Sequence, residues 1–257
     1  MSQYETLRVR HDDNICVVQL YRPAARNAIN ARMIAEFSTL LATCESSGMS
    51  VIVLEGLPDV FCFGADFNSV SDHAMTGRSD ESSAAALYDV WAKLASGPFV
   101  TIAHVRGAVN AGGNGFVAAC DIVIADASAS FSLSELLFGL YPACVMPFLV
   151  RRIGLQRANY MAISTQPIAA QQACEWGLVD RISDSGEAEL QRHLRRLRRL
   201  SRDSIASYKR YLSSLPCLIE SARAAAIENN RAMHTLPGVI EGIVRYTQTG
   251  QFPWEDR

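Results

Sequence analysis

The sequence predicts an α/β fold, and two kinds of segment support this prediction. Ser50–Glu55 (SVIVLE), Phe99–Val105 and Ile122–Ala125 are continuous apolar runs, which is the pattern of strands buried on both faces. Between such runs lie segments with apolar residues at helical spacing, such as Leu87–Leu94. Helices that alternate with buried strands are typical of layered α/β proteins.

The N-terminal part begins with a predicted β-hairpin. Thr6–Arg10 and Ile15–Leu20 alternate apolar and polar residues on either side of the turn residues Asp12-Asp13-Asn14. A helix ending near Gly48 is predicted next, because apolar residues recur at helical spacing at Met33, Ile34, Phe37, Leu40 and Leu41.

The segment Phe61–Phe67 (FCFGADF) places the glycine turn Gly64-Ala65-Asp66 directly after a strand. Polar residues dominate Asn68–Ser83, which predicts a mobile loop. The helix over Leu87–Leu94 follows and ends at Gly97-Pro98. It carries Tyr88 and Trp91 near one face; core packing is favoured for Trp91, whereas Tyr88 fits either the core or a binding site.

The stretch His104–Asp126 (HVRGAVNAGGNGFVAACDIVIAD) joins two predicted strands through glycine turns and a short apolar helix. Backbone N–H groups at such a helix start can hold an anion or a developing negative charge. A tight turn with close helix packing explains the glycines equally well. The residues after Gly112 match neither a P-loop nor a dinucleotide fingerprint.

Glu135 is a carboxylate in the otherwise apolar segment SLSELLFGLYPA. Desolvation there would raise its pKa toward neutrality, which suits proton transfer. The alternative is a capping box with Ser132, three residues earlier.

The C-terminal part is predicted to be mainly helical. Helices are expected over Met146–Ile153, Leu155–Ile163 and Ala169–Trp176, followed by a strand over Leu178–Ile182. From Glu187 the pattern is helical nearly to the end, with a boundary near Asp184 and breaks at Pro216 and Pro237. One helix carries six arginines that form either a solvated face or a docking surface for an acidic partner: Arg192, Arg195, Arg196, Arg198, Arg199 and Arg202.

The composition excludes several classes of function. A net charge of -2 over 257 residues does not indicate binding to nucleic acid or membranes. Tyr4–Arg10 is charged and strand-like and no apolar run could span a bilayer, so neither a signal peptide nor a membrane-spanning segment is expected. The seven cysteines lie singly, which predicts reduced thiols in a cytoplasmic protein. The five histidines show no metal-binding spacing, so no metal site is expected.

Several motifs together resemble the crotonase (enoyl-CoA hydratase/isomerase) superfamily over essentially the whole chain. They are FCFGADF, NAGGNGFVAACDIVIAD, SELLFGLYPA and QQACEWGLV. With YDVWAKL, HVRGAVNAGG and the terminal GQFPWED, they are most similar to the hydratases of polyketide β-branching cassettes. The resemblance implies a ββα spiral core over residues 1–185, a C-terminal helical trimerisation region over 186–257, and homotrimers or dimers of trimers.

The family's site residues can be carried over by position. Ala65 and Gly112 correspond to the two backbone N–H donors of the oxyanion hole, and Glu135 corresponds to a catalytic glutamate. The position of a second glutamate is Gly115 here, which makes two-carboxylate hydration doubtful and leaves one-base chemistry open.

Further residues are expected to contact the substrate or its carrier, and the family's pattern itself implies those near the turn after the second strand. Substrate contacts are expected from Gly64, Asp66, Gly113, Tyr88, Asn110 and Tyr141. Contacts with the pantetheine arm or carrier are expected from Arg22, Ala24 and Arg26. The free carboxylate of the substrate could be held by Tyr88, Lys93, His104 or Arg78.

The resemblance implies dehydration of 3-hydroxy-3-methylglutaryl-acyl carrier protein to 3-methylglutaconyl-acyl carrier protein. It implies no cofactor besides the phosphopantetheine of the acyl carrier protein or coenzyme A that carries the substrate. A crotonase-type decarboxylase would act next. The alternatives are a Δ3,Δ2-enoyl-CoA isomerase that uses the same glutamate, a general enoyl-CoA hydratase and, more remotely, a non-catalytic scaffold or RNA-binding paralogue.

Overall fold

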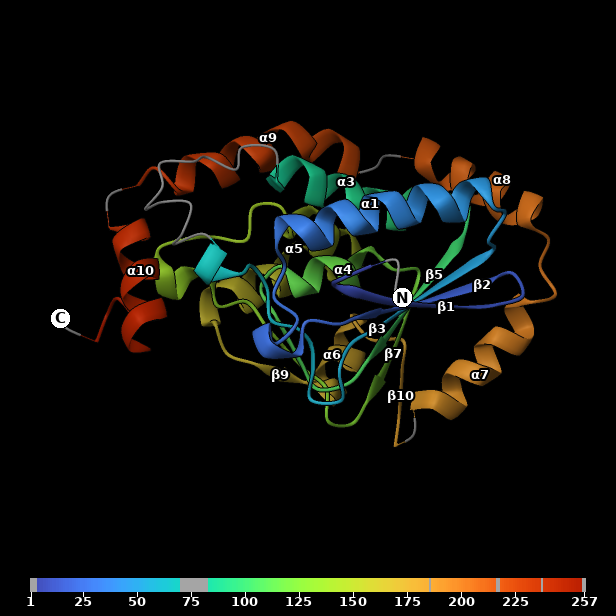
Figure 1. Ribbon diagram of the computed structural model, residues 1–257, viewed down its shortest axis with the longest axis horizontal. Coiled ribbons are helices and arrows are strands. Elements are labelled where there is room, and N and C mark those ends of the chain that lie inside the picture. The colour runs from blue at the N-terminus through green and yellow to red at the C-terminus, as the bar shows by residue number, and fades with distance from the viewer. Residues whose placement is uncertain (1–3, 70–82, 185, 216–217, 237, 256–257) are drawn as a thin grey trace.

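The computed structural model describes residues 4–69, 83–184, 186–215, 218–236 and 238–255 (Figure 1). Its strands form a six-stranded sheet of order β1-β2-β3-β5-β7-β10 and a four-stranded sheet of order β4-β6-β8-β9. The strands are β1 (Leu7–Asp12), β2 (Ile15–Leu20), β3 (Val51–Glu55), β4 (Val60–Cys62), β5 (Val100–Val105), β6 (Ala108–Asn110), β7 (Ile122–Asp126), β8 (Ser130–Ser132), β9 (Ile168–Ala169) and β10 (Arg181–Ser183).

Helices cover both sheets. The α-helices are α1 (Ala31–Ser46), α3 (Ser83–Ser96), α4 (Gly113–Ala119), α5 (Met146–Ser164), α6 (Ala170–Trp176), α7 (Gly186–Leu197), α8 (Arg202–Ser214), α9 (Leu218–Met233) and α10 (Val239–Thr249). The 3-10 helices are η1 (Pro23–Ala25) and η2 (Glu135–Phe138). The predicted α/β class is confirmed.

The six-stranded sheet separates two hydrophobic layers. β1 and β2 form the predicted antiparallel hairpin, and the strands from β2 to β10 are parallel. Alternate residues point to opposite faces of a strand. Val51 and Val53 therefore pack with Leu190 and Leu194 of α7, while Ile52 and Leu54 belong to the larger core that includes α1, α3 and α4. Figure 1 shows α7 on the opposite side of the strands from α1 and α3.

The predicted helices and strands are found with small shifts. Asn30 caps α1 through a hydrogen bond from the Met33 N–H, as expected for a helix start. Gly154 has a left-handed φ of 79° inside α5, which separates the two helices predicted on either side of it. The last strand begins at Arg181, later than the predicted Leu178, since Leu178 and Val179 instead complete the turn after α6.

Some features differ from the sequence-based expectations, and some expected features fall on residues that the structure does not describe. The short strands β6 and β9 were not predicted, because two or three residues are too few to show an alternating pattern. Residues 67–69 are helical, so the loop expected from Asn68 begins in a helix. The rest of that expected loop, residues 70–82, and the predicted breaks at Pro216 and Pro237 lie outside the described residues.

The C-terminal helices pack against the core at three places. Lys209 of α8 is 4% exposed, and its Nζ lies 2.6 Å from both carboxylate oxygens of Asp121, between α4 and β7. α9 packs on α3 and α5. α10 packs on η2 through a cluster that includes Phe138, Met233 and Ile243.

No helix in the described part of the chain is long and apolar enough to cross a membrane. The described cysteines are free thiols, and all of them except Cys174 are buried.

Candidate active site

Three parallel strands of the smaller sheet position the residues of the candidate site. β4 pairs with β6, and β6 pairs with β8 in parallel. Because the carboxyl ends of parallel strands meet at one edge of a sheet, the segments that follow these strands are neighbours. They carry Gly64-Ala65 after β4, Ala111-Gly112 after β6, and Ser134-Glu135 after β8.

The two glycine turns lie against each other. Gly64 has a φ of 89°, and a methyl group on it would lie 2.7 Å from the Ala111 Cβ and 3.4 Å from the Gly112 nitrogen. A methyl group on Gly113 would lie 2.5 Å from the Cys62 carbonyl oxygen, so glycine is needed there for α4 to pack on β4. Both turns predicted from the glycines are present and adjoin.

The N–H groups of Ala65 and Gly112 donate no hydrogen bond within the described residues. Ile29 forms hydrogen bonds with the residues on either side of Ala65 and not with Ala65 itself. Its N–H donates to the Gly64 carbonyl, and its carbonyl accepts from the Asp66 N–H. Ala65 is exposed. Two adjacent free N–H groups can stabilise a negative oxygen, with each donor contributing about 3–4 kcal/mol in a transition state.

Asp66 holds the first turn in place. Its Oδ1 accepts hydrogen bonds from the Asn68 and Ser69 N–H groups at the start of the following helix. Its Oδ2 lies 2.8 Å from Nη2 of Arg22, whose other terminal nitrogen donates to the Ala28 carbonyl. Asp66 is 6% exposed, so these contacts give it a positioning role beside Ala65.

Asn110, at the end of β6, ties the segment that carries Glu135 to the segment that carries Gly112. Its Nδ2 donates to the Ser134 hydroxyl at 2.9 Å, and its Oδ1 accepts from the Ser132 hydroxyl at 2.9 Å. η2 begins at Glu135 with Ser134 as its N-cap, so Ser132 and Glu135 do not hold the two positions of a capping box, and no side chain caps the helix. The capping-box alternative for Glu135 was therefore wrong.

Glu135 begins η2, where the residue as a whole is half-buried. Its Oε2 is buried and has no hydrogen-bond partner among the described residues. Burial raises the pKa of the Glu135 carboxyl to about 7, although the backbone N–H groups of Glu135 and Ser134 act in the opposite direction. Such a group can both take and return a proton near neutral pH.

Trp91 of α3 covers the face of α4 next to this edge, which the sequence did not predict. A methyl group on Gly115 would lie 2.5 Å from Cε2 and Cζ2 of the indole. The space above Gly115 is therefore filled by an aromatic ring. The glycine at this position was visible in the sequence, but its aromatic neighbour lies 24 residues away and only the fold brings it there.

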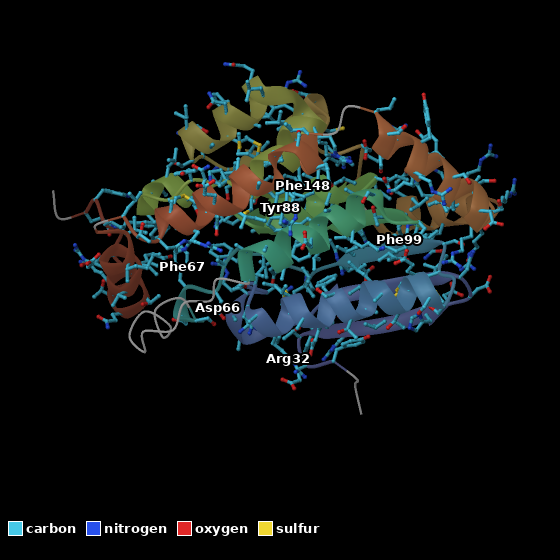
Figure 2. All side chains as sticks on the ribbon, turned by 90° about the horizontal axis from the view of Figure 1, so that it is seen from above. Arg32, Asp66, Phe67, Tyr88, Phe99 and Phe148 are labelled. Carbon is cyan, nitrogen blue, oxygen red and sulfur yellow. The ribbon has the colours of Figure 1, made fainter. Side chains whose placement is uncertain are left out.

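Tyr88 lies in the core rather than in a binding site. It is fully buried, and its hydroxyl donates to the Ile219 carbonyl of α9 at 2.6 Å. Figure 2 shows Tyr88 beside Phe148, and their ring centroids are 5.0 Å apart. The structure thus corrects the expected substrate contact of Tyr88, because its polar atom is used to attach α9.

Tyr141 lies at the surface after η2. It is 38% exposed, and its hydroxyl donates to Oδ1 of Asn229 on α9. It is therefore not the core aromatic that was the alternative to substrate contact, and its contact with substrate stays a prediction.

The three residues expected near the pantetheine arm differ in their surroundings. Arg22 is engaged inside the molecule by Asp66 and Ala28. Ala24 is exposed and lines a groove of about 350 Å³ beside η1. Arg26 is exposed, and its guanidinium lies 3.6 Å over the ring of Phe63, next to the Gly64 turn. Ala24 and Arg26 remain accessible to a ligand.

His104 does not reach the candidate site. Its side chain shares the sheet face of Ile102, which α7 covers, whereas α3 and α4 cover the other face. Its Nδ1 lies 3.3 Å from Oε1 of Glu55. Glu55, His104 and Glu187 place side-chain atoms of the kinds that ligate metal ions within 4.8 Å of one another. Glu55 also forms an ion pair with Arg10. A substrate contact of His104 is therefore excluded by its position.

Lys93 and Arg78 were also expected as residues that could hold the free carboxylate of the substrate. Lys93 pairs with Glu45 at 2.5 Å, and Arg78 lies outside the described residues. Within the arginine-rich segment, Arg192 pairs with Glu189, Arg198 pairs with Asp12, and Arg202 donates to the Glu45 carbonyl. These three arginines therefore contact α7 itself, the β1–β2 hairpin and the end of α1.

Known proteins of similar sequence and structure complete this description. A family model for enoyl-CoA hydratase/isomerase matches residues 10–257. The chain is 54% identical to the bacillaene synthase dehydratase PksH of Bacillus subtilis strain 168, over 99% of this chain and 98% of that protein. The crystal structure of the polyketide biosynthesis enoyl-CoA hydratase PksH from Bacillus subtilis matches with a TM-score of 0.95 at 53% identity, covering 98% of this chain and 100% of that chain.

A more distant relative is the mevalonyl-coenzyme A hydratase sidH of Aspergillus fumigatus, which is 35% identical over 66% of this chain and 63% of that protein. The family match spans the sheets, both glycine turns and the segment of Glu135. The chain therefore belongs to the enoyl-CoA hydratase/isomerase family and has the crotonase fold that its motifs predicted.

Proposed function

We propose that this chain dehydrates 3-hydroxy-3-methylglutaryl-acyl carrier protein to 3-methylglutaconyl-acyl carrier protein in polyketide β-branching. The observation that carries the proposal is the carboxyl of Glu135, whose Oε2 has no partner among the described residues and whose pKa is raised to about 7, on the strand edge where the free N–H groups of Ala65 and Gly112 adjoin. The 54% identity to a protein named as a dehydratase of bacillaene synthase supports dehydration in a polyketide pathway.

Each step of the elimination has a group on this edge to perform it. The N–H groups of Ala65 and Gly112 hold the thioester oxygen as it becomes an enolate oxygen. Ionised Glu135 takes the proton from C2. The C3–O bond then breaks, the electrons of the enolate form the C2–C3 double bond, and protonated Glu135 returns its proton to the departing hydroxide as water. One carboxyl group thus serves twice.

The one-base mechanism agrees with the residues that surround the site. Hydration by two carboxylates would need a second acidic group, and the α4 position at which the family carries it is Gly115 beneath Trp91. Elimination from a tertiary C3 gives an alkene conjugated with the thioester. The water that leaves is made from the C2 proton and the C3 hydroxyl of the substrate, so no second acidic group is needed to activate a water molecule. The reaction transfers no electrons to a cofactor, so the proposal requires only the phosphopantetheine arm as carrier.

The acyl carrier protein would approach beside η1. Arg26 is exposed next to the Gly64 turn and is held over Phe63, so its guanidinium can meet a phosphate or an acidic carrier surface. Ala24 lines the adjoining groove. A crotonase-type decarboxylase would take the product next, since its free carboxylate and conjugated alkene suit decarboxylation through a dienolate. Both partners would meet this chain in the cytoplasm.

The chain would act as a homotrimer or a dimer of trimers. Large apolar side chains are exposed on α5, at Leu155, Tyr160 and Ile163, and contacts between subunits would cover such side chains. Light scattering after size-exclusion chromatography tests this part of the proposal, and a monomer at micromolar concentration would contradict it.

The test of the reaction is intact-protein mass spectrometry of 3-hydroxy-3-methylglutaryl-carrier protein incubated with the wild type, Glu135→Gln and Glu175→Gln. Glu175 is an exposed glutamate on α6 and serves as the matched control. Loss of one water is expected with the wild type and with Glu175→Gln. Glu135→Gln is expected to lose at least about 10²-fold in rate, because the proton acceptor is gone.

A coupled decarboxylase removes the product, so that an unfavourable equilibrium cannot hide the elimination. Release of carbon dioxide only when both enzymes are present supports the proposal. No release, together with conversion of a 3-enoyl thioester, would assign the chain as an isomerase instead. Full activity of Glu135→Gln would move the base to another residue.

A further inference from the structure

The indole of Trp91 lies over the part of α4 that begins with the free Gly112 N–H. A methyl group on Gly112 would lie 3.9 Å from Cη2 of the ring, and one on Gly115 would lie 2.5 Å from Cε2 and Cζ2. Gly112 and Gly115 are three residues apart, so they lie on the same helix face. The benzene half of the indole thus extends from the Gly112 turn to Gly115, where it joins the pyrrole half that carries Nε1.

The Nε1–H of this indole is a buried donor with nothing to donate to. Trp91 is 1% exposed, and its Nε1 has no hydrogen-bond partner in the part of the chain that is described. Buried tryptophan N–H groups usually find a partner, and leaving one without costs free energy. Glu135 Oε2, on the same sheet edge as Gly112, is likewise buried without a partner.

Packing holds the indole in this orientation. Phe116 of α4 and Phe148 of α5 meet it edge to face, with centroid distances of 5.8 Å and 5.7 Å and interplanar angles of 84° and 78°. The absence of a side chain at Gly115 leaves the space that the ring fills. The ring reaches from Gly115 to the turn of Gly112, whose strand β6 pairs with the strand that leads to Glu135. A fixed donor without a partner, on a ring that contacts this turn, is suited to bind a ligand oxygen.

We propose that the Trp91 Nε1–H donates a hydrogen bond to the C3 hydroxyl of the substrate. This inference rests on the proposed dehydration and adds a group that recognises its leaving oxygen. An indole N–H is a donor only and cannot accept a proton. It stabilises the developing hydroxide while Glu135 delivers the proton, yet it cannot activate a water for attack on the alkene. Trp91 therefore favours substrates with a hydroxyl at C3.

The binding test uses ¹⁵N-indole NMR of the full chain with Glu135→Gln, so that the bound substrate is not consumed. The chain has three tryptophans, and loss of one signal in Trp91→Phe assigns the peak of Trp91. Two probes are compared: 3-hydroxy-3-methylglutaryl-pantetheine and 3-methylglutaryl-pantetheine, which lacks the hydroxyl. The Trp91 signal is expected to move downfield with the first probe only. No shift, or equal shifts with both probes, would overturn the inference.

The kinetic test compares Trp91→Phe with Trp254→Phe, a change at a half-exposed tryptophan near the C-terminus. Trp91→Phe is expected to lower kcat about tenfold with a smaller change in KM, because the lost hydrogen bond strengthens as the hydroxide forms. Trp254→Phe is expected to match the wild type. The double variant Trp91→Phe/Gly115→Ala refills part of the vacated space, and recovery of kcat there would show that only packing was lost.

The two proposals fail in different ways. A wild type that does not dehydrate the carrier-bound substrate contradicts the proposed function, whatever Trp91 does. If the wild type dehydrates the substrate but the Trp91 indole signal is the same with and without the C3 hydroxyl, only the role of Trp91 is contradicted. If Trp91→Phe does not fold, Trp176→Phe and Trp254→Phe assign the other two indole peaks, and the NMR comparison on the Glu135→Gln chain still decides.

Discussion

At the scale of single residues, burial determines how Glu135 can work. Burial removes its carboxyl from water, and this desolvation raises its pKa from the ordinary 4.5 to about 7. Both protonation states are then populated near neutral pH. A proton can be taken from carbon and returned to oxygen without a second acidic group.

The pH dependence of dehydration follows from this shift. Since ionised Glu135 takes the C2 proton, kcat/KM should rise with pH through about 7 and then level off. The measurement is the initial rate with the pantetheine thioester between about pH 5 and 9. A rise centred near the ordinary pKa of a glutamate would contradict the raised pKa.

The same shift predicts that Glu135→Gln stabilises the fold at higher pH. With a raised carboxyl pKa, the folded state binds more protons than the unfolded state between pH 4.5 and about 7, so stability falls as pH rises through this window. Above pH 7, Glu135→Gln should therefore gain on the order of 1–3 kcal/mol over the wild type.

Near pH 4 the two proteins should unfold alike, because Glu135 is then protonated in both states. Urea unfolding at both pH values measures the difference, and Glu175→Gln is the control on an exposed glutamate. A constant difference at all pH values would mean that the amide changes packing rather than proton binding.

At the scale of elements, three short parallel strands determine which groups meet. β4, β6 and β8 are three residues each, too short to be stable alone, and Asn110 fastens the last two together. The Gly112 turn and Glu135 thus depend on one side chain for their relative position. Asp66 and Arg22 do the same for the Ala65 turn.

Removing this tie should harm catalysis more than binding. Asn110→Ala leaves the hydroxyls of Ser132 and Ser134 without their partner, so the Glu135 segment can shift against Gly112. A drop in kcat of about tenfold or more is expected, with KM changed less. Gln191→Ala, which removes an exposed hydrogen bond to Glu187 on α7, is the control and should retain kcat. Equal kcat values for both variants would contradict a positioning role of Asn110.

At the scale of the whole molecule, the C-terminal helices are attached to the core by a few specific contacts. The Tyr88 hydroxyl fixes α9, a hydrophobic cluster places α10 against η2, and the Lys209–Asp121 pair fixes α8. Asp121 also accepts from the Thr101 N–H, so the pair joins α8 to β5 near the end of α4. The packing of α10 on η2 therefore links this part of the C-terminal region to the segment that carries Glu135.

Breaking the Lys209–Asp121 pair should destabilise the whole protein. Lys209→Met leaves the carboxylate without its cation, and removing one partner of a buried pair costs about 3–5 kcal/mol. Asp121 is a quarter exposed, so the lower end of that range is expected. Lys93→Met removes a more exposed pair with Glu45 and should cost less than about 1 kcal/mol. Thermal unfolding of both variants provides the comparison, and equal losses would contradict the burial argument.

Local patterns in the sequence were enough to predict several elements of this structure. Residue spacing predicted the hairpin, the buried strands, the helices on both sides of Gly154 and the two glycine turns, because periodicity and backbone freedom act over a few neighbours. The motifs predicted the family, which the match over residues 10–257 confirmed. The unusual position of Glu135 among apolar residues was also visible in the sequence.

Which side chains from distant parts of the sequence come into contact depends on the packing of the whole fold. Tyr88 is buried under α9, and His104 faces α7, because helix packing and strand alternation choose the side of the sheet. Trp91 lies over Gly115 although 24 positions separate them in the sequence. The pKa of Glu135 also depends on neighbours that the fold supplies, since desolvation comes from all atoms around a group and not from its place in the chain.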